Sequence, residues 1–136
     1  TTNIQVLVRD AGPIANNDVN NFSAQAQGQD FNVVMMLDIS GSMAGDKIAL
    51  LKAAVANLFA DLNGYTGGQV MVHLVPFSTD TFASGTFDLS TPQGYQAALA
   101  YLNALETEGG LTNYEAPLQD AISWLQSGNA IPGAQT

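Results

Sequence analysis

The feature that most constrains the fold is a nearly continuous apolar run at residues 31–37, which ends at Asp38. A strand with one solvated face alternates apolar and polar residues, whereas a strand covered on both faces stays apolar throughout. The run therefore predicts a strand buried on both faces, as in a parallel sheet. A second run of this type, at residues 69–75, is expected to stop at Pro76.

Helical periodicity accompanies these two runs. Within residues 46–62 apolar side chains recur at spacings of three and four, and Asp46 is the expected N-cap. Residues 93–105 and 114–126 show the same spacing, and the more polar stretch 81–89 suits an edge strand. Strands that alternate with helices predict an α/β fold, with an open sheet and helices on both faces.

The length of 136 residues suits one compact domain. Residues 1–30 are expected to form an N-terminal strand and a polar linker, and residues 31–136 the domain itself. The chain has no cysteine, which excludes disulfides and thiolate metal sites. No stretch is long and apolar enough to cross a bilayer, so direct membrane insertion is not expected.

The charge balance is strongly acidic, with 3 basic residues, 12 acidic residues and a net charge of −9. Such a field repels phosphate backbones and anionic membranes, so nucleic acid is not an expected partner. It concentrates cations near the surface, although acidity also keeps a domain in solution without any further role.

The residues that carry chemistry directly follow the first apolar run. Asp38 stands at the carboxyl end of that strand, where open α/β sheets bind their ligands. Asp38, Ser40 and Ser42 alternate along a tight loop in which Gly41 allows the turn, so one carboxylate and two hydroxyls can face one point. With no nearby His or Cys, these oxygen donors select Mg²⁺, Ca²⁺ or Mn²⁺. A single carboxylate compensates a dication incompletely and leaves it able to bind an outside acidic group.

Two segments carry a family resemblance, which covers about residues 31–126. Residues 38–43, Asp-Ile-Ser-Gly-Ser-Met, resemble the DxSxS motif of von Willebrand factor A (vWA) domains, which forms their metal-ion-dependent adhesion site. Residues 109–113 resemble the Gly-Gly-Thr-Asn loop of the family, with Leu111 inserted before the threonine. The resemblance implies a Rossmann-like, mostly parallel sheet and an Mg²⁺ or Ca²⁺ cofactor, with Mn²⁺ also possible. The metal ligands that it implies are Asp38, Ser40, Ser42 and Thr112.

One element of the family pattern is missing. The third metal motif of vWA domains is an aspartate after a fourth long strand, and no such strand follows Trp124. We therefore expect a partial vWA-like domain, truncated before that strand, whose first strand has an exposed edge. Such a chain should bind metal weakly and associate with itself, with the missing C-terminal part of the fold or with another chain.

The resemblance implies a binding module and not an enzyme: cation-dependent capture of an acidic group on a protein or surface ligand. The low charge content, the missing cysteines and the polar N-terminal segment are similar to those of large bacterial RTX-type surface adhesins. Secretion to the bacterial cell surface is the corresponding expectation.

Two alternatives remain open. One is a structural module whose cation only stabilises the fold. The other is a phosphotransfer enzyme that uses Asp38. A haloacid-dehalogenase phosphatase needs a second aspartate where Ser40 stands, and a response-regulator receiver needs a later lysine, whereas no basic residue follows Lys52.

The site residues also have purely structural interpretations. Turn and capping roles are the alternatives for Asp38, Ser40 and Ser42. Thr112 suits an N-cap, with Glu115 three residues later completing a capping box. His73 is a lone histidine in a strand and is expected to be structural, because a transition-metal site needs a second His or Cys.

Overall fold

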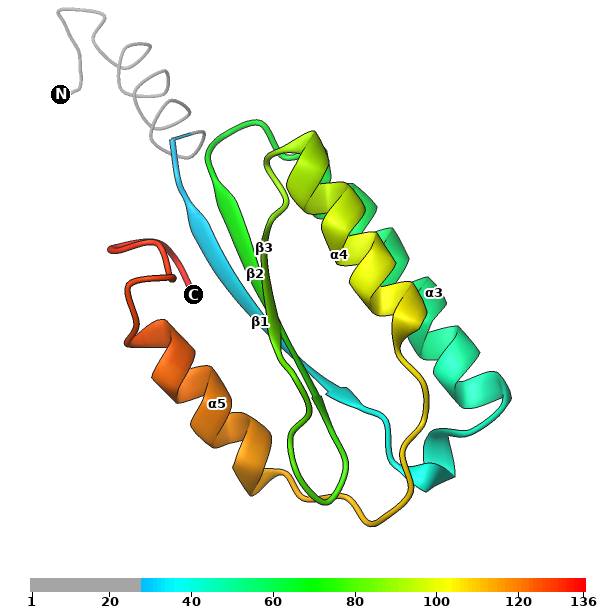
Figure 1. The fold of residues 1–136 in the computed structure, drawn as a ribbon. Helices are drawn as coiled ribbons and strands as arrows, with labels where there is room; N and C mark the ends of the chain where they lie inside the picture. The colour runs from blue at the N-terminus through cyan, green and yellow to red at the C-terminus, as the bar shows by residue number, and fades with distance from the viewer. Residues whose placement is uncertain (1–27) are drawn as a thin grey trace, which may run out of the picture.

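The computed structural model describes residues 28–136 (Figure 1). The N-terminal strand and most of the linker that we expect from the sequence therefore lie outside the described residues. The elements in chain order are β1 (Phe31–Asp38), η1 (Gly41–Met43), α3 (Asp46–Asn63), β2 (Val70–Phe77), β3 (Gly85–Asp88), α4 (Pro92–Ala104) and α5 (Glu115–Leu125). None of the helices in this part of the chain is long and apolar enough to cross a membrane.

The sheet has three strands in the order β1-β2-β3. β1 and β2 run parallel over their full lengths, from the pair Phe31–Val70 to the pair Asp38–Phe77. β3 pairs antiparallel with β2 through four residues and forms the opposite edge. This arrangement confirms the predicted α/β class with an open sheet, which within residues 28–136 is mixed, with one parallel and one antiparallel pair.

Helices cover both faces of the sheet, but unequally. Figure 1 shows α3 and α4 side by side on one face and α5 alone on the other. The core cluster lies on the α3 and α4 side and is built from Leu37, Val55, Phe59, Val70, Val72, Leu74, Leu89, Ala98 and Leu102. Full burial of a large apolar side chain contributes about 1.5–3 kcal/mol, so this layer supplies most of the apolar stabilisation.

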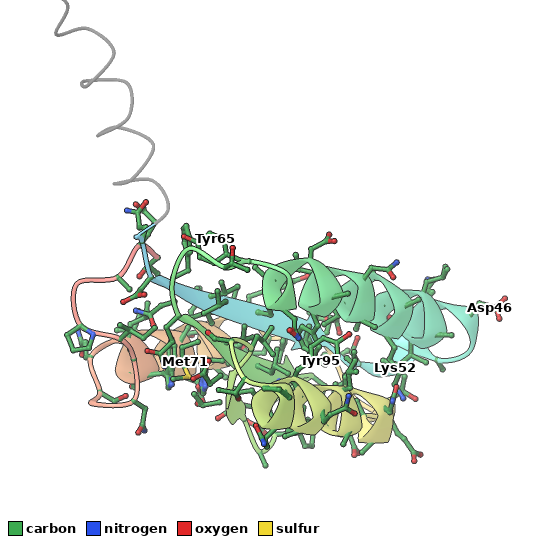
Figure 2. All side chains as sticks on the ribbon, turned by 90° about the horizontal axis from the view of Figure 1, so that it is seen from above. Asp46, Lys52, Tyr65, Met71 and Tyr95 are labelled. Carbon is green, nitrogen blue, oxygen red and sulfur yellow. The ribbon has the colours of Figure 1, made fainter. Side chains whose placement is uncertain are left out.

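A polar contact joins the two helices of that layer. Lys52 lies between α3 and α4 in Figure 2, and its Nζ donates a hydrogen bond of 3.0 Å to the carbonyl of Asn103 in the last turn of α4. A cation at a helix C-terminus is favourable because the terminal carbonyls carry partial negative charge.

α5 is held on the other face by polar contacts around His73. The Nε2 atom of His73 lies 2.6 Å from Asp120 Oδ1, and its Nδ1 atom lies 2.9 Å from Thr86 Oγ1. The imidazole also stacks on Trp124, with ring centroids 4.8 Å apart. His73 is buried and fully engaged, so its role in this structure is to join β2 to α5.

The outer edge of β1 carries one short contact. Gln135 makes an isolated parallel bridge with Phe31, in which Asn32 donates to the Gln135 carbonyl and Gln135 to the Asp30 carbonyl. The Asn32 side chain anchors the same tail through two 2.9 Å bonds to the backbone of Ile131. The tail is therefore tied to the start of β1, and within residues 28–136 no strand pairs with the rest of that edge.

Pro76 does not stop β2, contrary to the expectation from the sequence. The strand continues to Phe77, still in parallel register with β1. The Pro76 carbonyl accepts from Phe82 N–H, so the backbone of this residue faces away from β1. The ladder with β3 ends at Leu74. The missing N–H of the proline therefore removes no bond to β1.

The sequence predicted Asp46 as the N-cap of α3, and this prediction is wrong. The N-cap is Gly45, with φ of 79°, and Asp46 is the first helical residue. The chain leaves η1 through a left-handed backbone that glycine adopts without strain. Asp46 instead supplies negative charge to the first turn of the helix, and its side chain points outward in Figure 2.

Candidate metal site

The loop after β1 begins at the carboxyl edge of the sheet. Ile39 N–H donates to the Phe77 carbonyl at 2.9 Å, which continues the parallel pairing by one residue. Asp38 Oδ1 then accepts the Ser40 N–H at 2.9 Å. Asp38 thus acts as a turn residue through one carboxylate oxygen, and no hydrogen bond to its other oxygen is found within residues 28–136. The turn role leaves one oxygen for a ligand.

Three hydroxyl groups meet beside this turn. Ser40 Oγ lies 3.2 Å from Ser42 Oγ, and Thr112 Oγ1 donates to Ser40 Oγ at 3.3 Å across 72 positions of sequence. Ser40 is 1% exposed, so the central hydroxyl is withdrawn from bulk water. Ser40 precedes η1 without a side-chain capping bond, so the capping interpretation of this residue is wrong.

Residues that follow β2 hold the second loop in place. Asn113 N–H donates to the Ser78 carbonyl at 2.8 Å, and its side-chain amide donates to the Thr79 carbonyl at 3.0 Å. Ser78 and Thr79 were not singled out from the sequence. Their position directly after a buried strand, at the same sheet edge as Asp38, is the signal that could have found them.

Leu111 does not displace Thr112 from the hydroxyl cluster. Its N–H donates to Thr79 Oγ1 at 3.0 Å, while its side chain is 80% exposed. Gly110 precedes it with φ of 103°, and a Cβ atom there would lie 2.5 Å from Thr79 Oγ1. Only glycine fits this close approach, so the extra residue turns outward and Thr112 still reaches Ser40.

The capping box expected for α5 is not formed. Asn113 Oδ1 accepts the Glu115 N–H at 3.0 Å, and Tyr114, at the N-cap position, makes no side-chain capping bond. Thr112 is two positions too early to cap the helix, and its hydroxyl turns to Ser40 instead. The capping role predicted for Glu115 is therefore wrong, and so is the capping interpretation that was the alternative to metal binding at Thr112.

The donor set fits a hard cation but is sparse in charge. Within the described residues, no three His, Cys, Asp or Glu side chains gather into a group that could hold a metal ion. The available donors are one carboxylate oxygen of Asp38 and the hydroxyls of Ser40, Ser42 and Thr112. These are the oxygen ligands that Mg²⁺ and Ca²⁺ accept, and they exclude metals that require thiolate or imidazole.

The fold and this loop pair define a class: an open α/β domain with hydroxyl and carboxylate donors at the carboxyl edge of its first strand. A family model of the von Willebrand factor type A domain matches residues 33–134. The chain therefore belongs to the von Willebrand factor type A family. A comparison with curated proteins finds no significant match.

Proposed function

We propose that this vWA domain is a protein-interaction module in which a divalent cation captures an acidic group of a partner. Asp38, Ser40, Ser42 and Thr112 would hold the ion, as Mg²⁺ or Ca²⁺, in the manner of a metal-ion-dependent adhesion site. A bound dication supplies an electrophilic centre for the carboxylate of the partner. The residues of the chain itself orient that centre and keep part of it dry.

The observation that supports this proposal is the meeting of three hydroxyls from two distant loops. Thr112 reaches Ser40 because its neighbour Asn113 is hydrogen-bonded to the carbonyls of Ser78 and Thr79, and not because the two residues are close in sequence. Packing alone gives no reason to gather hydroxyls at a sheet edge next to a carboxylate. A cation that shares them does, because hard cations prefer several neutral oxygens with few charges.

The wider role is part of the same proposal. The chain would act in a large, RTX-type bacterial surface adhesin, outside the cell, with an acidic protein or surface ligand as partner and without enzymatic activity. The edge of β1 beyond Asn32 would accept a further strand, from the rest of the fold or from another chain. A module whose cation only stabilises the fold is the competing function.

The test replaces the carboxylate. Asp38→Ala should abolish the rise in melting temperature that saturating Mg²⁺ or Ca²⁺ gives the unaltered chain. An ion at about 100 times its dissociation constant adds about 2.7 kcal/mol to the free energy of unfolding. Differential scanning calorimetry, first with added cation and then with EDTA, measures the melting temperatures of the variant and of the unaltered chain. Asp61→Ala, an exposed carboxylate at the far end of α3, is the matched control and should keep the response.

Two outcomes oppose the proposal. If Asp38→Ala keeps the full cation response, the ion binds elsewhere. If the cation raises the melting temperature through Asp38 while cation-dependent adhesion of the protein is unchanged by Asp38→Ala, the structural module replaces the binding function.

A further inference from the structure

A groove opens next to the candidate metal loop. Figure 1 shows the connections β1–α3, β2–β3 and α4–α5 gathered at one end of the sheet, and the groove lies among them. Its volume is about 530 Å³. Its apolar lining comes from Ile39, Pro76, Phe82, Ala83, Ala104 and Leu105.

The groove and the metal loop share residues. Ile39, which lines the groove, stands between Asp38 and Ser40, and its carbonyl accepts the Glu108 N–H at 2.7 Å. Glu108 also lines the groove. A partner segment that reaches the oxygen donors of the loop therefore has the groove directly beside it.

The polar side of the groove is negative. Glu106 and Glu108 both line it, both are exposed, and neither forms an ion pair with a described residue. Ala104, another lining residue, ends α4, where backbone carbonyls add partial negative charge. In residues 28–136 the basic side chains other than His73 are Lys47 and Lys52, and Lys52 is bound to Asn103. The groove thus favours a cation from outside.

The walls of the groove are formed before any partner arrives. The Tyr101 hydroxyl donates to the Ala83 carbonyl and ties α4 to the β2–β3 connection. Burial, and next the negative charge of Asp120, raise the pKa of Tyr101 to about 12, so this hydroxyl remains a donor even above the pH at which an ordinary tyrosine ionises. A preformed site loses less conformational entropy on binding. Phe82 remains 38% exposed at the groove, an apolar surface available to a partner.

We propose that this groove is a specificity site for the partner of the metal loop. Beside its metal-binding carboxylate, the partner presents an apolar side chain that fills the groove and a Lys or Arg that pairs with Glu106 and Glu108. This inference rests on the proposed function. It adds that the partner is recognised by an acidic, an apolar and a basic group together.

Fluorescence anisotropy with synthetic peptides tests the groove on the whole chain. The reference peptides contain one glutamate, a glycine spacer of one to four residues, one phenylalanine and one lysine. The matched peptides replace phenylalanine by serine, or lysine by glutamate. In Mg²⁺ at low salt, the best reference peptide should bind about 10-fold more tightly than its serine form, because phenylalanine buries apolar area. It should bind about 3-fold or more tightly than its charge-reversed form.

Two variants separate the groove from the metal loop. Ala104→Phe should fill the groove and remove the preference for phenylalanine, while the Mg²⁺ response of the melting temperature stays unchanged. Ala53→Phe, on the exposed face of α3, is its control. Glu106→Gln should weaken the preference for lysine, and Asp61→Asn should not. Circular dichroism confirms that each variant folds.

The outcomes distinguish the two proposals. Peptide binding that needs Mg²⁺ but ignores the phenylalanine and the lysine overturns the groove and leaves the metal function standing. Loss of every Mg²⁺-dependent signal overturns the metal function and this inference with it. If Ala104→Phe instead converts a dimer to a monomer in sedimentation velocity, the groove holds a second copy of the chain and the peptide partner is excluded.

Discussion

The two faces of the sheet are built on different principles. On one face α3 and α4 enclose a continuous apolar core in which Phe59, Leu74 and Leu102 are fully buried. On the other face α5 is anchored by a histidine–carboxylate pair and a stacked tryptophan, and it leaves apolar side chains at the surface. These exposed side chains are Leu118 (48%), Ile122 (51%) and Leu125 (37%).

The two faces therefore differ in how much apolar surface they bury: one stabilises the sheet, and the other leaves apolar surface to which a further segment or chain can bind. The face under α3 and α4, called here the closed face, carries the buried core cluster, and the exposed Leu50 and Leu58 lie on the outer side of α3. The face under α5 is called the open face. The α5 face leaves a groove of about 510 Å³ between α5 and β1, lined by Val34, Met36, Leu118 and Leu125 among others. Successive side chains of β1 point to opposite faces of the sheet. Val33, Met35 and Leu37 therefore pack with the core, while Val34 and Met36 face α5 and line its groove.

The largest expected effect lies in the closed face. Phe59→Ala should lower the free energy of unfolding by about 3–5 kcal/mol, because the cavity left by a buried phenylalanine cannot collapse fully. Leu58→Ala, its neighbour with 42% exposure, should cost about 1 kcal/mol or less. Urea denaturation followed by circular dichroism measures both. Equal losses at the two positions would show that this layer is not a packed core.

The His73–Asp120 pair that holds α5 on the open face should contribute less to the free energy of unfolding. Asp120→Ala leaves His73, 5% exposed, without its carboxylate partner and should cost about 1–3 kcal/mol. It should also weaken the Mg²⁺ response, since α5 begins directly after the loop that carries Thr112. Gln119→Ala, exposed on the same helix, is the control. The fluorescence of Trp124, the single tryptophan, reports the stacking directly. An unchanged emission spectrum and an unchanged denaturation midpoint would show that contacts other than the His73–Asp120 pair hold α5 on the sheet.

Self-association should depend on the open face alone. Met36→Lys places a charge beside the unpaired edge of β1 and should weaken association of the chain with itself about 10-fold, or about 1.4 kcal/mol. Leu50→Lys, at a 69% exposed position on α3, should leave it unchanged. Sedimentation velocity over a concentration series makes the comparison. Equal weakening by both substitutions would indicate nonspecific charge repulsion and not a defined edge.

The smallest effect concerns pH. The pKa of Tyr101 is raised from 10.0 to about 12 in the folded chain, by burial first and by Asp120 second. Below pH 10 both the folded and the unfolded chain keep the proton. Between pH 10 and 12 the unfolded chain releases it first, so stability falls as pH rises. Tyr101→Phe should flatten this part of the stability curve, measured by urea denaturation. A slope that is unaffected by the substitution would assign the alkaline loss to other tyrosines.

Most of the fold follows from local pattern. The apolar runs before Asp38 and Pro76 predicted two strands buried on both faces. This is right for β2 but wrong for most of β1, which is half-buried and leaves Met36 42% exposed. The three-and-four spacing predicted each α-helix to within one or two residues. The predictions that Pro76 ends β2 and that Asp46 caps α3 were wrong for the same reason. In both cases the outcome depends on the direction of the backbone, which neighbouring segments set. Residue type alone carries no information about those directions.

The candidate site divides in the same way. Asp38, Ser40 and Ser42 could be grouped from sequence, because their spacing in one short loop limits where they can point. Thr112 was implied by the family resemblance alone, because spacing gives no reason for it to reach the loop. Its position beside Ser40 depends on the hydrogen bonds of Asn113 to Ser78 and Thr79 and on the outward turn of Leu111.

The sequence by itself determined the α/β class, the strand that ends in a carboxylate and the hydroxyls beside it, because short-range spacing dictates which face a side chain takes. Only the tertiary structure decided which face of the sheet is closed, how His73 and Asp120 meet and what lies next to the candidate metal site. Those relations join residues tens of positions apart, and such contacts exist only after the whole chain has packed.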